Sequence, residues 1–323
     1  KPEEILALTF TDKAANEMLE RVEDNLPLGY GDIWISTFHS FCDRILRQEG
    51  HYIGIDTNYS MMSQAQSYIF FRKHLFDFSL KKFRPYGNPT KFIDDILSHF
   101  SRLQDEDVSP EEYLEYAKSL PKRGDANKEE YEDTLELATV YDEYSKLKIK
   151  NSKVDFGDLI LLTIKLFREK PNVLKRYQEK FKYTLVDEFQ DTNYTQSVLV
   201  NILSGLDPKK DLDKIGKVNP NLTVVGDDDQ AIYKFRGAAI SNILQFKKYY
   251  PKAKEVVLTE NYRSKQEILD SAYGLIKNNN PYRLEITEKI DKRLISKTTY
   301  ARDEDAVELV VAENEDAESE WIA

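Results

Sequence analysis

The chain has 323 residues, of which 41% are hydrophobic and 32% charged, a composition typical of a folded globular protein of one or two domains. No apolar run approaches the roughly 20 residues that cross a bilayer, so we expect no membrane partner. Cys42 is the only cysteine, which excludes internal disulfides and thiolate zinc clusters. It also favours a reducing compartment, and we expect a cytoplasmic protein.

The net charge of −11 argues at first against a nucleic-acid partner, because such binding draws on lysine and arginine. The acidic residues are unevenly distributed, however. The last 23 residues contain nine acids and one arginine, so they carry −8 and the rest of the chain carries −3. Net charge therefore does not exclude a nucleic acid.

Short, continuous apolar runs predict buried strands of a parallel sheet. The predicted strands are residues 5–9, 33–38, 184–186, 222–225 and 256–259. Helical patterns follow most of them, as in "AANEMLERVEDNL" and "HSFCDRILRQE". This alternation predicts an α/β fold, with a parallel sheet and helices on both faces.

Strand signals disappear between about residues 66 and 172, where stretches such as "NKEEYEDTLELATVYDEYSKLKI" carry apolar residues at helical spacing. An all-helical insertion is therefore predicted, and strands resume at Tyr183. The sequence "NNNP" at 278–281 predicts a linker. The predicted domains are 1–65 with 173–280, which share one sheet, the insertion 66–172, and a further domain that begins in 281–323.

Polar residues follow each predicted strand at the point where it ends. In an open parallel sheet, ligands bind beside these carboxyl ends. The residues collected there are Thr9-Phe10-Thr11, Thr37-Phe38-His39, Asp187-Glu188, Gly226-Asp227 and Asn261-Tyr262-Arg263. We therefore expect a binding site along this edge of the sheet.

Asp187 and Glu188 are adjacent, so their side chains point to opposite faces of a strand and should not both grip one metal. One carboxylate that holds Mg²⁺, beside a second that orients or deprotonates a water, is the arrangement that nucleoside-triphosphate hydrolysis needs. The alternative is a surface loop or helix start whose acids serve as caps.

Six stretches at these strand ends and beside the insertion are distinctive: "ALTFTDKAANEMLERV", "ISTFHSFCDRILR", "VDFGDLI", "LVDEFQDTN", "VVGDDDQAIYKFRGA" and "LTENYRS". In this order they resemble the motifs of the UvrD, Rep and PcrA group of superfamily 1 DNA helicases. Asp12 stands where asparagine is usual, and Gly157 where an acid is more common. The resemblance covers the sheet-forming parts and implies that they make a first RecA-like motor domain, with 281–323 opening a second.

The resemblance also implies a role for each matched residue in ATP hydrolysis. Asp187 would hold Mg²⁺, and Glu188 would activate the attacking water. Gln230 would sense the γ-phosphate of ATP, Arg263 would bind and stabilise the charge that develops on it, and Tyr262 would stack on adenine. The alternatives are that Gln230 caps a turn, that Arg263 pairs with a surface acid and that Tyr262 belongs to a core.

Aromatic and polar residues near the strand ends predict a single-stranded DNA surface, because stacking on bases needs no net positive charge. The predicted contacts are Thr9, Phe10, His39, Tyr233, Phe235 and Arg236. Phe235 stands where relatives often have tryptophan, and Ala231 replaces a common serine. The resemblance implies that the partners are single-stranded DNA and single/double-strand junctions, whereas an aromatic pair such as Tyr233 and Phe235 also occurs in ordinary cores.

A phosphate loop, GxxxxGK[ST], is missing from the sequence, since the only Gly-Lys pair, Gly216-Lys217, is followed by Val218. The resemblance places this loop upstream of residue 1. We therefore expect an internal fragment of a 3′ to 5′ helicase that does not hydrolyse ATP alone. The alternatives are a non-enzymatic single-stranded DNA-binding module and a metal-dependent nuclease, although neighbouring acids on one strand suit a two-metal site poorly.

Overall fold

The computed structural model describes residues 1–26, 33–123, 127–231, 240–298 and 307–323. The chain forms two compact units, Lys1–Ala253 and Lys254–Ala323. Among the described residues, no helix combines the length and the apolar character needed to cross a bilayer.

A four-stranded parallel sheet organises the first unit. Its strands, in spatial order, are β2 (Trp34–Thr37), β1 (Ile5–Thr9), β5 (Tyr183–Val186) and β6 (Leu222–Val224). Leu8 pairs with Ser36 on one side and with Val186 on the other, and Val186 pairs in turn with Val224. All four carboxyl ends therefore lie along one edge, and the predicted mixed α/β fold with a parallel sheet is confirmed.

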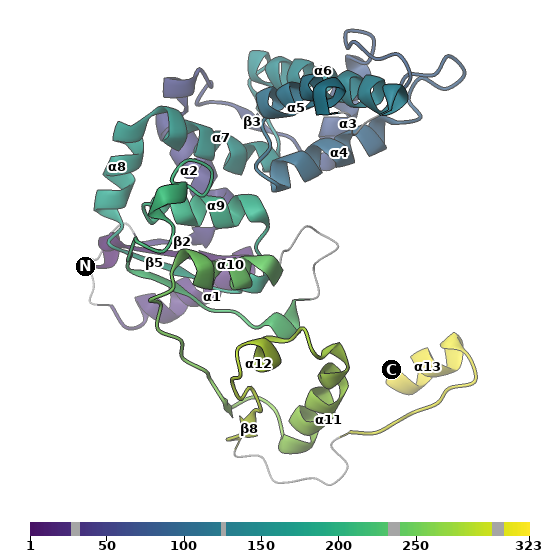
Figure 1. Cartoon of the computed structure of the whole chain (residues 1–323). Coiled ribbons are helices and arrows are strands. Elements are labelled where there is room, and N and C mark those ends of the chain that lie inside the picture. The colour runs from purple at the N-terminus through teal and green to yellow at the C-terminus, as the bar shows by residue number, and fades with distance from the viewer. Residues whose placement is uncertain (27–32, 124–126, 232–239, 299–306) are drawn as a thin grey trace. The chain divides into compact units, whose positions relative to one another are not determined.

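Helices connect and flank these strands. In chain order they are α1 (Asp12–Glu23), α2 (Phe38–Glu49), α3 (Gln64–Lys73), α4 (Ile93–Asp105), α5 (Pro110–Arg123), α6 (Lys128–Lys150), α7 (Phe156–Glu169), α8 (Pro171–Lys180), α9 (Tyr194–Leu203) and α10 (Ile240–Tyr249). Thr11 and Thr37 cap α1 and α2 by accepting backbone hydrogen bonds, so both helices start where their strands end. Figure 1 shows α2, α7 and α9 on one side of the sheet and α1 on the other.

Two large hydrophobic clusters hold most of the first unit together, and a smaller one contains Leu206, Tyr249 and Tyr250. The first joins Leu6, Leu8 and Val186 of the sheet to buried side chains of α2, α7, α8 and α9. The second lies among α3, α4, α5 and α6, which Figure 1 shows as one bundle, and includes Phe71 and Tyr144. Helix α7 packs in the sheet's cluster although it falls within the predicted insertion 66–172. The domain boundaries at 65, 172 and 280 remain predictions.

A buried ion cluster joins the two groups of helices. Lys148 of α6 has a side chain only 2% exposed, and its Nζ lies 2.5 Å from Asp155 and 2.6 Å from Asp158. Asp155 and Asp158 form a capping box at the start of α7, just after the short parallel pair β3 (Ser60–Met61) and β4 (Lys153–Val154). The two carboxylates thus share one ammonium group, so each buried charge lies beside an opposite charge.

Gly157, the departure from the related motif, is explained by the same cluster. Gln104 at the end of α4 donates from its Nε2 to Asp155 and to Asp158. A Cβ added at Gly157 would lie 2.2 Å from the Gln104 side-chain oxygen. Because glycine has no Cβ, the buried Gln104 amide can occupy this space.

One predicted strand is absent from the described part of the second unit. Residues 256–259 form no strand, and a two-residue strand β7 (Glu260–Asn261) pairs instead with β8 (Ile295–Ser296). Val256 and Leu258 are 68% and 74% exposed. The prediction of a fifth strand at 256–259 was wrong because an apolar run becomes a strand only where a neighbour accepts its backbone hydrogen bonds.

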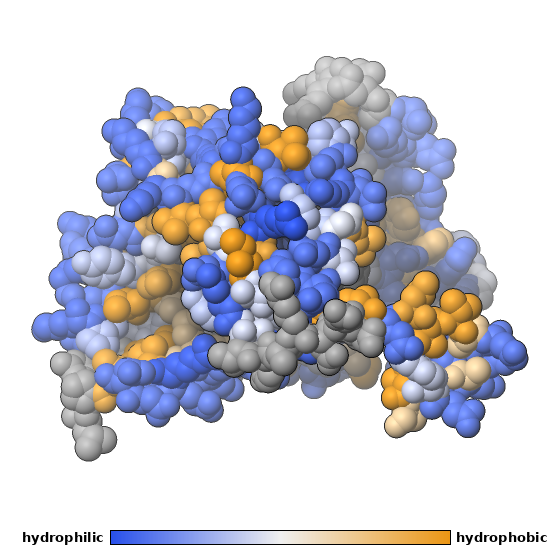
Figure 2. Space-filling model, turned by 90° about the horizontal axis from the view of Figure 1, so that it is seen from below, coloured by the Kyte–Doolittle hydropathy of each residue, from blue (hydrophilic) through white to orange (hydrophobic). Residues whose placement is uncertain are grey.

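The helices of the second unit are α11 (Gln266–Ile276), α12 (Leu284–Thr287) and α13 (Glu315–Ile322). None of the described residues in these helices is fully buried, in contrast to the helices around the four-stranded sheet. On the face of the molecule seen in Figure 2, hydrophilic residues predominate and hydrophobic ones form separate patches.

We predict that Lys148→Met destabilises the first unit by about 3–5 kcal/mol, because two buried carboxylates lose their cation. The matched control is Lys146→Met, two residues earlier on α6, whose side chain is 73% exposed and pairs with Asp142 on the surface. Urea unfolding followed by circular dichroism measures both variants. Equal midpoints for Lys148→Met and Lys146→Met would contradict a stabilising role of the buried cluster.

Candidate active site

Backbone hydrogen bonds place the predicted acids between two neighbouring strands. The Asp187 amide donates to the Leu8 carbonyl (2.9 Å), so the chain remains paired with β1 one residue past β5. On the other side, the Val225 amide donates to the Val186 carbonyl, and the Phe189 amide donates to the Val225 carbonyl, both at 2.8 Å. Asp187 is half-buried and Glu188 is exposed at this edge of the sheet. The structure therefore brings both acids to the strand ends, as the sequence predicts.

Glu188 sits at a sharp bend of the backbone. Its φ of 48° and ψ of 45° lie in the left-handed region, which costs a residue other than glycine on the order of 1 kcal/mol. A short 3₁₀ turn, Phe189–Asp191, follows immediately. Gln190 in this turn donates from its Nε2 to Glu188 Oε2 at 2.6 Å, so the exposed carboxylate has a fixed neighbour.

The turn after β6 lies against the same glutamine. The Asp227 amide donates to Gln190 Oε1 at 3.0 Å. A second 3₁₀ turn, Asp228–Gln230, ends with Gln230, which is exposed and donates from its Nε2 to Asp227 Oδ2 at 2.9 Å. Gln230 thus contacts the side chain of Asp227, the residue that caps this turn, and its predicted role remains a prediction.

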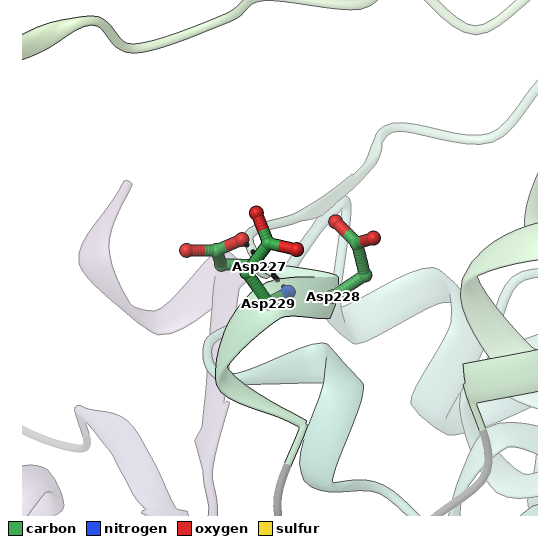
Figure 3. Close-up of side chains that lie close together, drawn as sticks. All are labelled: Asp227, Asp228 and Asp229. Carbon is green, nitrogen blue, oxygen red and sulfur yellow. Dashed lines mark hydrogen bonds between the residues drawn. The ribbon is translucent and has the colours of Figure 1, made fainter. Parts of the chain in front are cut away.

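Three consecutive carboxylates crowd this turn. Figure 3 shows Asp227, Asp228 and Asp229 together, and their ligand oxygens lie within 4.8 Å of one another. All three are half-buried and take part in other polar contacts, including the bond from the Asp229 amide to Asp227 Oδ1. Acidic groups of this kind are common without a metal, so the cluster alone defines no metal site.

Oxygen atoms along the edge suit a hard cation such as Mg²⁺. Within the described chain, Thr9 Oγ1 and Asp191 Oδ1 are buried and lack a hydrogen-bond partner. Burial raises the pKa of Asp191, and the nearby Glu188 charge raises it further. The residues present therefore fit a magnesium ion held by oxygen ligands, with Asp187 as the predicted ligand.

The predicted DNA contacts are only partly covered by the described residues. Thr9 is fully buried at the end of β1, whereas Phe10 and His39 are half-buried. The His39 ring packs edge-on against Phe156, with 5.6 Å between the ring centroids. Burial lowers the pKa of His39 below its ordinary value, although the nearby Asp12 charge opposes this shift. Tyr233, Phe235 and Arg236 lie outside the described residues, as does the aromatic surface that they were predicted to form.

Tyr262 and Arg263 belong to the second unit. Tyr262 is 71% exposed, so it is not a core residue there, and its hydroxyl donates to Glu260 Oε2 at 2.5 Å. The Arg263 amide donates to Asn261 Oδ1 at 3.0 Å. Their predicted contacts with ATP remain predictions.

Sequence reasoning missed the polar contacts that hold the start of α9. Asn193 caps this helix and also donates from its Nδ2 to Asp105 Oδ1 of α4 at 2.6 Å. Thr195 Oγ1 accepts from the Asp107 amide and donates to the Gln104 carbonyl. The spacing of Asn193 and Gln196 is a capping-box signal that could have located the helix start, but nothing in the sequence indicates the partner on α4.

The strand-end acids and the parallel sheet define an α/β protein whose candidate site lies at the carboxyl edge of the sheet. Residues 1–251 match the family model of the UvrD/REP helicase N-terminal domain, and the chain belongs to this family. The resemblance inferred from the strand-end motifs is thereby confirmed.

Three relatives are each named ATP-dependent DNA helicase PcrA. The protein of Bacillus subtilis (strain 168) is 44% identical over 280 residues, which cover 86% of this chain and 34% of the relative. The Staphylococcus aureus (strain Mu50) protein is 41% identical over 282 residues, with the same coverage of 86% and 34%. The Leuconostoc citreum protein is 38% identical over 294 residues, covering 91% and 34%. The chain thus spans about a third of the length of these relatives.

We predict that the burial of Asp105 at the end of α4 makes stability depend on pH. Burial raises the pKa of Asp105 to about 6 from an ordinary value of 3.8, although the Asn193 hydrogen bond opposes this rise. Because the folded state then binds the proton more tightly, Asp105 favours folding below about pH 4, and this contribution is lost as the pH rises through about 6.

Asp105→Asn keeps an acceptor for Asn193 and cannot ionise. We therefore expect it to raise the free energy of unfolding above pH 6 by on the order of 2 kcal/mol, with no gain below pH 4. Urea titrations between these pH values measure the difference, with the exposed Asp213→Asn as control. A gain that does not change with pH would contradict the assignment to Asp105.

Proposed function

We propose that this chain is part of an ATP-driven helicase that moves 3′ to 5′ along single-stranded DNA and acts at single/double-strand junctions. The observation that carries the proposal is the placement of Asp187 and Glu188 at the end of β5, between the ends of β1 and β6 and beside the turn that bears Gln230, in a chain of the UvrD/REP family. The relatives' names support ATP dependence and DNA as the substrate. A cytoplasmic location is part of the same proposal.

In the proposed organisation, 1–65 and 173–280 form the first RecA-like motor domain, 66–172 is a helical insertion domain, and 281–323 opens the second motor domain. Closure of the two motor domains on ATP would move the DNA strand. The second cluster of buried side chains among α3 to α6 supports a separately packed insertion.

The chemistry proposed for the edge is hydrolysis of ATP. Asp187 supplies an oxygen ligand to magnesium, which when bound neutralises charge on the phosphates. Glu188 accepts a proton from a water molecule, whose oxygen forms a bond to the γ-phosphorus. The bond between the γ-phosphorus and the bridging oxygen breaks, and ADP leaves with that electron pair. Gln230 would contact the γ-phosphate, and the family resemblance further implies that Arg263 would stabilise its developing charge and that Tyr262 would stack on the adenine.

We predict that Glu188→Gln, made in a chain extended to the length of the relatives, binds ATP but hydrolyses it at least about a hundredfold more slowly, because general-base catalysis contributes roughly 10²–10⁴ in rate. Glu179→Gln on α8, an exposed glutamate that pairs with Lys175, is the control and should hydrolyse ATP normally. Nucleotide binding and steady-state phosphate release are measured on both. Normal turnover by Glu188→Gln would remove Glu188 from the mechanism.

We also predict that the 323-residue chain alone shows no significant ATPase or unwinding activity, because its sequence has no phosphate loop to grip the triphosphate. Phosphate release with Mg²⁺ and single-stranded DNA tests this, with the extended chain as positive control. Multiple turnovers by the short chain would refute it. If the extended chain binds DNA but neither hydrolyses ATP nor changes its DNA affinity with nucleotide, the non-enzymatic alternative is favoured.

A further inference from the structure

A buried glutamine amide joins the two halves of the candidate site. Gln190 is 1% exposed, and the two ends of its amide contact different segments of the chain. Its Nε2 donates to Glu188 Oε2 at 2.6 Å, and its Oε1 accepts from the Asp227 amide at 3.0 Å. One side chain therefore connects the carboxylate after β5 to the turn after β6.

The orientation of this amide is fixed by the chemistry of its partners. A backbone N–H can only donate, so the Gln190 atom that faces the Asp227 amide must be the oxygen. The nitrogen then necessarily points to Glu188, whose ionised carboxylate can only accept. Both bonds are made together, and the bond to a charged acceptor is the stronger kind.

The glycine beside this amide leaves little spare room. A Cβ added at Gly226 would lie 2.8 Å from Gln190 Oε1 and 3.3 Å from the Gln190 backbone nitrogen. Real Cβ atoms essentially never come that close to the side-chain oxygen, so the amide would have to move. Gly226 therefore allows the Gln190 amide to lie close to the backbone of Gly226 and Asp227.

We propose that Gln190 is a positioning residue that orients the Glu188 carboxylate and ties it to the Gly226–Asp227 turn. This inference rests on the proposed role of Glu188 in ATP hydrolysis. Glu188 is exposed, so without Gln190 its carboxylate would rotate freely and would occupy the orientation needed to take a proton from water only part of the time. Gln190 itself has no direct part in the chemistry.

Three variants of the extended chain test the proposal. Gln190→Met keeps the size and removes both hydrogen bonds, while Gln190→Glu keeps an acceptor for Asp227 and places a negative charge against Glu188. Gly226→Ala displaces the amide without altering its chemistry. We expect each to lower kcat by about 10–100-fold, the usual effect of losing a partner that orients a catalytic group, with the KM for ATP nearly unchanged. Gln190→Met and Gln190→Glu should also lower the melting temperature, because the first leaves the Asp227 amide without its acceptor and the second buries a negative charge.

Matched controls separate positioning from folding. Gln196→Met changes a glutamine that is 4% exposed and caps α9, and Gly87→Ala adds a methyl group where no atom lies within 4 Å. Both should keep the kcat of the unmodified protein, although Gln196→Met should lower the melting temperature.

Glu188→Gln, measured in parallel, separates this inference from the proposed function. If Glu188→Gln hydrolyses ATP at the normal rate, the proposed role of Glu188 is wrong, regardless of the kcat of the Gln190 variants. If Glu188→Gln hydrolyses ATP slowly but Gln190→Met and Gly226→Ala keep the kcat of the unmodified protein, only the positioning role is overturned. A loss of kcat in these variants that Gln196→Met reproduces, or that a raised KM for ATP accompanies, would also overturn it, because it would reflect structure only.

Discussion

The parallel hydrogen-bond ladder that continues past the ends of β1, β5 and β6 is the constraint on which the site depends. Leu8 accepts from Asp187, Val186 accepts from Val225, and Val225 accepts from Phe189. These bonds involve only backbone atoms, so the positions of the two acidic residues do not depend on the contacts of their side chains. A carboxylate at such an edge lies beside solvent and beside its neighbours at the same time, which allows it to stay ionised while contacting a ligand.

Buried polar contacts then connect this edge to the helices. Arg168 of α7 bonds to Asp107 beyond α4 and to Asp207 beyond α9, while Lys148 of α6 pairs with both acids at the start of α7. Apolar packing tolerates sliding between helices, whereas such ion pairs tolerate it poorly because a displaced charge stays buried without its partner. The segment beyond the end of α9 is therefore held relative to α4 and α7, while Asn193 and Thr195 hold the start of α9 against the end of α4.

Much of this architecture was predictable from sequence, because the first four apolar runs are strands within a residue or so of the expected ends. The run at 256–259 shows the limit, since apolar continuity does not reveal whether a strand has a neighbour to pair with. In the same way, Asp187 and Glu188 were found because charged residues directly follow a buried strand. Gln190 was not found, because its role depends on Asp227, which is 37 residues away in sequence and close only in the folded chain.

The surroundings of the strand-end residues differ in a way that matches the different roles proposed for them. Asp187 is half-buried and its backbone is bonded to β1, which suits a ligand that must not move. Glu188 is exposed on a left-handed bend, which suits a group that must reach water but leaves its side chain without packing. Such a group needs support from a partner that is itself immobile. Gln190 meets that need because it is buried and bonded at both ends, so any shift of the Gly226–Asp227 turn would act directly on the orientation of Glu188.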